Sequence, residues 1–112
     1  MLNQVLLIGR LTADPLVREL ESGKKVCDIN LAVQRSFKNQ DGLYETDFIP
    51  ITLWQGLAET LSQFCQKGTL IAVRGRVQVR TSFIHDKSIP TLEIIGERIT
   101  YLSAGKKELE TE

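Results

Sequence analysis

Residues 47–80 read DFIPITLWQGLAETLSQFCQKGTLIAVRGRVQVR and hold, in succession, the patterns of a strand, a helix and a second strand. Along residues 47–54, aliphatic side chains take every second position, at Ile49, Ile51 and Leu53. This alternation is the period of a strand with one buried face. Phe48 and Trp54 have the other parity and share the opposite face. Pro50 lacks the N–H that a sheet ladder needs, so we expect this strand at a sheet edge or bulged there.

The helix and the second strand follow directly. Over residues 57–66 the apolar side chains form one helical stripe, and Gly68, just beyond it, is a good stop signal. The stripe consists of Leu57, Leu61, Phe64 and Cys65. Residues 69–80 alternate again, with aliphatic side chains or glycine on one side. The other side is a basic stripe made of Arg74, Arg76, Gln78 and Arg80.

Working outward, the rest of the chain is also patterned as strands. The patterns cover residues 3–11, 16–20, 26–35 and 91–102, of which the second is short. A polar loop is expected over residues 36–45, and a bulge or bend at Gly96. Five long strands with one helix between the third and the fourth are the element order of an OB-fold, a five-stranded, partly open Greek-key barrel. The sequence therefore predicts an all-β domain of this class over residues 1–104 and a short disordered tail over 105–112.

The composition limits the kinds of partner that the chain can attract. Its 112 residues suffice for one domain, and 14 basic residues balance 14 acidic ones. A chain with no net charge has no global positive field to draw in nucleic acid. Any surface that binds an anionic partner must therefore come from a local cluster of basic residues.

Motifs for catalysis and for metal binding are missing. Cys27 and Cys65 lie far apart and His85 is the one histidine, so neither a zinc site nor a disulfide framework is predicted. We interpret both cysteines as small apolar core residues and His85 as a solvated hairpin residue. Without a nucleophile, phosphate-loop or metalloprotease motif, we expect no enzyme activity and no cofactor. No apolar stretch approaches the roughly 18 residues of a membrane span, which predicts a cytoplasmic protein.

Single-stranded nucleic acid needs flat side chains for its bases and cations for its phosphates, and the sequence offers both. The candidate stacking residues are Phe37, Phe48, Trp54 and Phe83. The candidate cations are Arg74, Arg76 and Arg80, with Arg35 and Lys38 extending the track along the polar loop. Stacking contributes roughly 1–3 kcal/mol per base, so three or four such side chains can hold an oligonucleotide without a strongly basic protein. The alternative interpretations are partly buried aromatics, a subunit contact and an ordinary solvated arginine face.

Four motifs in order then resemble the bacterial single-stranded DNA-binding protein family, over residues 2–102. They are NQVLLIGRLTADPLVR at 3–18, INLAVQRSF at 29–37, TDFIPITLW at 46–54 and QKGTLIAVRGRVQVR at 66–80. The resemblance implies an OB-fold, a homotetramer, and non-catalytic coating of single-stranded DNA in replication, recombination and repair at the nucleoid. It also implies that the family's stacking aromatics correspond to Phe37, Phe48 and Trp54.

Two positions depart from the family pattern. The family's fourth aromatic falls on Ser82, seven residues after Gly75, and Phe83 is its neighbour. A shift of one residue turns a side chain to the other face, so Phe83 can serve only if a bulge restores it. The chain also stops at ELETE, residues 108–112, and so resembles the short, tail-less members, some of which are linked to DNA uptake. We therefore expect weak or absent recruitment of other proteins through a tail.

Two other functions stay open at this point. A primosomal accessory protein has the same fold and binds both DNA and a helicase. A protein-interaction adaptor would carry the aromatic face without using it for DNA. Assembly is a separate expectation, because a small barrel leaves strand edges and apolar surface exposed, and pairing through the first strand, near residues 2–6, would cover them.

Overall fold

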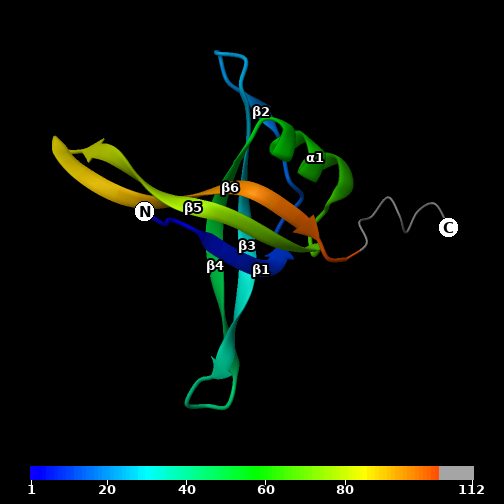
Figure 1. The fold of residues 1–112 in the computed structure, drawn as a ribbon. Helices are drawn as coiled ribbons and strands as arrows, with labels where there is room; N and C mark the ends of the chain where they lie inside the picture. Colours follow the sequence, from blue (N-terminus) through cyan, green and yellow to red (C-terminus); the bar gives the residue numbers. More distant parts are fainter. Residues whose placement is uncertain (104–112) are drawn as a thin grey trace.

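The computed structural model describes residues 1–103 of the chain. These residues form β1 (Val5–Leu11), β2 (Arg18–Glu19), β3 (Lys25–Lys38), β4 (Tyr44–Trp54), α1 (Gly56–Phe64), β5 (Leu70–Ile84) and β6 (Lys87–Tyr101) (Figure 1). No helix within this part of the chain is long and apolar enough to cross a membrane. The tail predicted over residues 105–112 lies outside the described residues.

The strands form one sheet that closes into a barrel. The strand order is β1-β5-β6-β4-β3-β2, and β1 also pairs with β3, which closes the barrel. The pairs are antiparallel except for β4 and β6, which run parallel. A closed barrel of five strands with a helix between β4 and β5 is an OB-fold, so the fold prediction is confirmed. The short strand β2 is an addition to it.

Aliphatic side chains that alternate along the strands fill the barrel. The largest fully buried side chains are Val26, Cys27, Leu31, Ile51, Leu53, Leu61, Ile71 and Val73. Helix α1 contributes Leu61 and packs against β3, β4 and β6. Cys27 and Cys65 are buried, as predicted, and this burial raises the pKa of both thiols. The two thiols therefore stay protonated at neutral pH.

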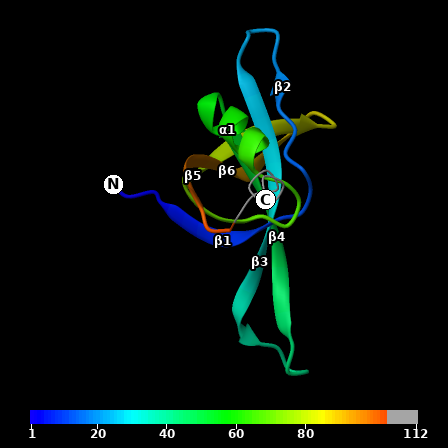
Figure 2. The same ribbon diagram turned by 90° about the vertical axis from the view of Figure 1, so that its right-hand side faces the viewer.

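The β3–β4 hairpin extends beyond the barrel as an arm (Figures 1 and 2). β3 continues to Lys38 and β4 begins at Tyr44, so the loop predicted over residues 36–45 was too long. The tip is held by Asn39, whose side-chain oxygen accepts hydrogen bonds from the backbone N–H groups of Asp41 and Leu43. Most of the predicted loop is therefore strand.

The β5–β6 hairpin forms a second arm, directed away from the first (Figure 1). β5 ends at Ile84 and β6 begins at Lys87, so both strands are longer than predicted. His85 and Asp86 make the two-residue connection, with φ of 51° and 63°. Positive φ at both central residues is typical of the type I′ turn, whose twist matches that of the flanking strands.

Helix α1 is shorter than predicted. It ends at Phe64 rather than at residue 66, because Cys65 takes extended backbone (φ −123°, ψ 156°) and enters the core. Gly68 has a φ of +92°, which glycine adopts readily, but it serves the turn into β5, where its N–H donates to the carbonyl of Leu11. The predicted apolar stripe is wrong at Phe64, whose side chain is 54% exposed.

The bulge predicted at Gly96 lies between β5 and β6. The register shifts next to the Gly75–Gly96 pair, which leaves Glu97 without an opposite residue. A Cβ atom at Gly75 would collide with the carbonyl oxygen of Ile95, so only glycine allows the two strands to approach this closely. The bulge prediction is confirmed.

The expectation that the strand with Pro50 lies at a sheet edge or is bulged there is wrong, because β4 lies between β6 and β3 in the sheet and its register runs without a shift through Pro50. Up to Pro50, β4 pairs with β3 alone, and β6 first joins β4 at Ile51 and Thr52. The missing N–H of Pro50 therefore costs no strand pairing. This segment of β4 becomes one wall of a groove.

Candidate nucleic-acid interface

Three aromatic side chains lie on the outer face of β4. The register places Phe48 opposite Ala32, with its side chain exposed, and Trp54 has the same parity. Tyr44 shares this parity and is 48% exposed. Tyr44 is not among the predicted stacking residues, because the polar pattern over residues 36–45 indicated a loop. Tyr44, Phe48 and Trp54 are separated by even numbers of residues, and this shared parity was the signal that could have found Tyr44.

Trp54 ends β4 and is held by the residue after it. Gln55, with a φ of 55°, donates its N–H to the carbonyl of Lys25 over 2.8 Å. The side-chain oxygen of Gln55 accepts the Lys25 N–H over 3.3 Å. These two bonds tie the end of β4 to the start of β3 and fix the chain direction at Trp54. Trp54 is 37% exposed, so its position in the chain is fixed while the residue stays open to a ligand.

A groove of about 270 Å³ separates the outer face of β4 from the β5–β6 arm. One wall consists of Asp28, Pro50, Ile51 and Thr52. The other wall consists of Arg80, Thr91, Leu92 and Glu93. Pro50 and Thr52 have the same parity as the β4 aromatics, and they lie between Phe48 and Trp54 in the strand. The groove therefore brings Arg80 to the aromatic face.

A second hollow, of about 430 Å³, lies where β1 meets the β3–β4 arm. It is lined by Ile8, Gly9, Arg10, Ala32, Gln34, Thr46 and Leu70. Ala32 is the cross-strand neighbour of Phe48, so this hollow adjoins the aromatic face. The guanidinium of Arg10 is fixed there by a 2.9 Å hydrogen bond from Nη1 to the carbonyl of Gly68. Arg10 is therefore a cation beside the stacking side chains.

Acidic residues link the arginines of the predicted stripe. Arg76 donates from Nη1 to Glu97 over 3.2 Å and from Nη2 to Gln78 over 3.1 Å. Gln78 donates to Glu93 over 2.6 Å, and Glu93 also lies 3.9 Å from Nε of Arg80. The Arg76 side chain is 43% exposed and the Arg80 side chain 66% exposed, so water screens these attractions and they are weak. An incoming phosphate competes with two carboxylates for them.

Arg74 lies outside this network. The bulge separates it from Arg76, and the register places it opposite Arg98 on β6 and opposite Leu6 on β1. The predicted stripe is thus divided, with Arg80 in the groove and Arg74 on the outer face of β1, β5 and β6. The structure does not bring the three arginines together in one hollow.

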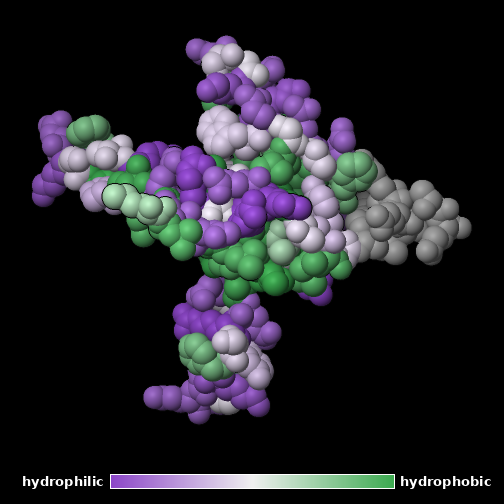
Figure 3. Space-filling view, viewed as in Figure 1, coloured by the Kyte–Doolittle hydropathy of each residue, from purple (hydrophilic) through white to green (hydrophobic). Residues whose placement is uncertain are grey.

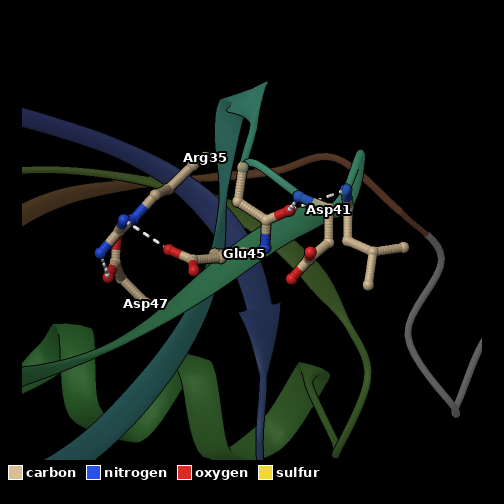
Figure 4. A network of polar contacts seen from close by, with 6 residues as sticks. Arg35, Asp41, Glu45 and Asp47 are labelled. Carbon is tan, nitrogen blue, oxygen red and sulfur yellow. Dashed lines mark hydrogen bonds and ion pairs between the residues drawn. The ribbon is translucent and has the colours of Figure 1, made fainter.

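Arg35 does not extend the cationic track as an open charge. It donates from Nε and Nη2 to the two oxygens of Asp47, over 3.1 and 3.0 Å, and from Nη1 to Glu45 over 2.6 Å (Figure 4). The hydrogen bonds from Arg35 lower the pKa of Asp47. Asp47 pairs with Val33, on the face opposite that of Phe48. Two carboxylates therefore balance the Arg35 charge on the far face of the arm.

Phe37 and Lys38 lie toward the end of the same arm. Phe37 is exposed, in an irregular stretch where the register shifts between Gln34 and Lys38. The ammonium of Lys38 lies 5.7 Å from the ring centroid of Tyr44, which is within cation–π distance. The arm therefore offers an aromatic and a cation beyond Phe48.

Phe83 lies on the β5–β6 arm, in register with Ser88. The register runs without a shift from Gly75 to Ile84, so the bulge that Phe83 required is absent there. Its parity is that of Val79, opposite to that of Arg80. The structure does not bring Phe83 to the aromatic face.

Comparisons with known proteins identify the family of the chain. The model of the single-strand binding protein family matches residues 2–102. Single-stranded DNA-binding protein B of Bacillus subtilis (strain 168) is 39% identical over 110 residues, which cover 96% of each chain. Single-stranded DNA-binding protein 1 of Clostridium acetobutylicum is 38% identical over 95% of this chain and 98% of its own. A single-stranded DNA-binding protein of Oceanobacillus iheyensis is 40% identical over 91% of this chain and 64% of its own. The chain therefore belongs to the single-strand binding protein family.

Proposed function

We propose that this protein binds single-stranded DNA without sequence preference. The observation that carries the proposal is the row of Tyr44, Phe48 and Trp54 on one face of β4, beside a groove bordered by Arg80. Bases stack on the three rings, and every base has a π-face, so the identity of the base matters little. The names of the relatives support the same ligand.

Stacking supplies most of the affinity. The chain carries no net charge, and Arg76 and Arg80 are already linked to carboxylates. A phosphate that binds these arginines replaces a carboxylate, so it gains only the difference between the two interaction energies. Each stacked base contributes roughly 1–3 kcal/mol. The salt dependence is accordingly moderate. Duplex DNA is rejected, because its bases are stacked on one another and are not available to the three rings.

The cellular role follows from binding without chemistry. The protein coats single strands during replication, recombination, repair or DNA uptake and catalyses no reaction on them. It assembles as a homotetramer through the exposed apolar side chains of β1, which Figure 3 shows as a hydrophobic band. Several copies then present several aromatic faces to one strand.

Trp54 is the single tryptophan of the chain, so intrinsic fluorescence tests the proposal directly. We expect oligo-dT to quench this fluorescence, and the affinity to fall as salt rises, by about 0.7 logarithmic units per tenfold salt for each phosphate contacted. A duplex of equal length is the control and leaves the emission unchanged. Absence of quenching by oligo-dT at low salt would overturn the proposal.

A further inference from the structure

A third hollow, which we call the Asn30 hollow, adjoins the groove on the β3 side of the aromatic face. Its volume is about 300 Å³, at the lower end of the roughly 300–1,000 Å³ that is typical of small-molecule pockets. It shares Asp28 and Pro50 with the groove. The other lining residues come from β3 and from the chain just after β1, and they are Thr12, Ala13, Asp14, Pro15, Ile29 and Asn30.

Hydrogen bonds hold the walls of the Asn30 hollow in place. Thr12 donates from its backbone N–H and from its Oγ1 to the carbonyl of Asn30, over 3.1 and 2.9 Å. Asp14 accepts a hydrogen bond from the backbone N–H of Lys67 over 2.7 Å. The segment after β1 is therefore tied both to β3 and to the turn that precedes β5. A ligand meets a preformed hollow and loses little free energy in ordering it.

The rings on β4 leave a gap beside the Asn30 hollow. Phe48 and Trp54 are six residues apart in the strand, about 20 Å at 3.3 Å per residue. Neighbouring bases of a duplex strand lie about 3.4 Å apart, so this gap is longer than one nucleotide. Pro50 lies in the gap and pairs with Asn30. A DNA strand that stacks on both rings therefore carries bases past the hollow that neither ring holds.

The lining of the hollow suits a base better than a phosphate. Asp14 and Asp28 are acidic, and among the described residues that line the hollow none is basic. Arg18 donates to Asp28 over 2.9 Å but is not one of the lining residues. A phosphate in the hollow would thus meet carboxylates and no lining cation. The side-chain amide of Asn30 has both donors and an acceptor, so it can pair with the edge of any base.

We propose that the Asn30 hollow is a base pocket, which takes one base of the bound strand between Phe48 and Trp54. The base packs against Ala13 and Pro50 and turns its polar edge toward Asn30. This inference rests on the proposed function, because it assigns a place to a base that the stacking rings leave over. An amide that serves every base keeps the binding free of sequence preference.

The pocket and the assembly use different residues. Copies assemble through the exposed apolar side chains of Leu2, Leu6 and Ile8, and none of these lines the Asn30 hollow. The lining begins at Thr12, after β1 has ended. The proposed pocket therefore needs no surface that the proposed assembly covers.

Nuclear Overhauser effects between the protein and bound oligo-dT test the pocket in the full chain. We expect contacts from the methyl groups of Thr12 and Ala13 to the H6 and C5-methyl protons of thymine. Thr12→Ser, which keeps the hydroxyl, assigns the Thr12 methyl signal by its loss. Contacts to sugar protons alone would place the backbone in the hollow and overturn the proposal. Contacts of thymine with Trp54 but with neither methyl would also overturn it, and would leave the proposed function intact.

Ala13→Leu tests the pocket by filling it. Ala13 is exposed, so the larger side chain occupies the hollow without entering the core. With a labelled oligo-dT of about 16 nucleotides, the upper end of what one OB-fold binds, we expect anisotropy to show a loss of affinity. The loss should be roughly fivefold, the low end of what one stacked base contributes, because the hollow has no ring.

Ser22→Leu is the matched control, because it adds the same side chain to another exposed turn. It should keep the affinity of the unaltered protein, and both variants should unfold at the same urea concentration as that protein. Saturating oligo-dT should still quench Trp54 in both. Equal affinities of the two leucine variants would overturn the pocket, whereas absence of quenching in the unaltered protein would overturn the proposed function itself.

Discussion

Asp47 and Phe48 are neighbours in the chain, but their side chains lie on opposite faces of β4 and do different things. Asp47 accepts two hydrogen bonds from Arg35, and Phe48 is exposed opposite Ala32. The parity of each residue thus decides whether it belongs to the ion-pair network or to the stacking face. A shift of one residue in this strand would exchange the two roles.

The pKa of Asp47 is a residue-scale test of the ion pair. Hydrogen bonds from Arg35 hold this pKa below the ordinary value of about 3.9. A lowered folded-state pKa means that the contact stabilises the fold above the ordinary pKa and that this contribution is lost as the pH falls through the folded-state value. A carboxyl NMR titration measures the shift, and in Arg35→Gln the pKa should return toward the ordinary value. An unchanged pKa in that variant would show another cause.

Tyr44 and Phe83 make a matched pair of aromatic substitutions. Tyr44 lies on the stacking face and Phe83 on the other face of the second arm. We expect Tyr44→Ala to weaken binding of a labelled oligo-dT, in fluorescence anisotropy, by the roughly 1–3 kcal/mol of one stacked base. Phe83→Ala should leave the affinity nearly unchanged. The reverse order would place the binding face on the opposite side of the β5–β6 arm.

At the scale of elements, the two arms owe their length to pairing and not to a core. Within the barrel, β4 and β5 alternate between buried and exposed side chains. Beyond the barrel, residues 79–81 and 87–92 are exposed at every position. The arms are therefore held by ladder hydrogen bonds and cross-strand pairs, which leaves both of their faces open to a ligand.

The close approach at the β5–β6 bulge is an element-scale prediction. In Gly75→Ala the new methyl group meets the Ile95 carbonyl, so we expect a loss of about 1–3 kcal/mol in the free energy of unfolding, measured in urea. Gly56→Ala is the control, because nothing lies within 4 Å of a Cβ there. It should leave stability unchanged or raise it slightly, since alanine favours a helix. Equal stability of the two variants would contradict the assigned clash.

The difference between strands that pack on the core and arms that do not explains what could be predicted from the sequence. The positions of Ile49, Ile51 and Leu53 were predicted correctly because burial on one face imposes an alternation that can be read from the chain. Residues 81–84 were not predicted to belong to β5. No core lies beside the arm there, so nothing imposes an alternation of apolar and polar side chains. The partners of Arg35 depend on cross-strand register, which local patterns do not fix. The separation of Arg74 from Arg80 likewise depends on cross-strand register and could not be predicted from local patterns.

At the scale of the whole molecule, the arms make the chain extended. Its Cα radius of gyration is 15.9 Å, whereas about 13 Å is typical of a compact domain of roughly this size. Leu2, Leu6 and Ile8 are exposed around β1, between the arms. Burying this apolar surface between copies would provide the additional core that a small barrel lacks.

Light scattering at micromolar concentration tests assembly through β1. We expect the protein to have the mass of an oligomer and Leu6→Asp to lower that mass, because the new carboxylate would be buried between copies. Leu16→Asp, at another exposed leucine, is the control and should keep the mass of the unaltered protein. A monomer before any substitution would refute the assembly.

The parallel contact between β4 and β6 has a consequence for motion. It consists of two residue pairs, Ile51 with Ile94 and Thr52 with Ile95, and Ile51 and Thr52 also line the groove. Because this contact is shorter than the antiparallel ladders beside it, we expect its amide protons to exchange with solvent earlier than those of the ladders. A DNA strand in the groove would bridge this contact and shift its opening equilibrium toward the closed form. Binding at the surface would then be recorded as slower hydrogen exchange inside the barrel wall.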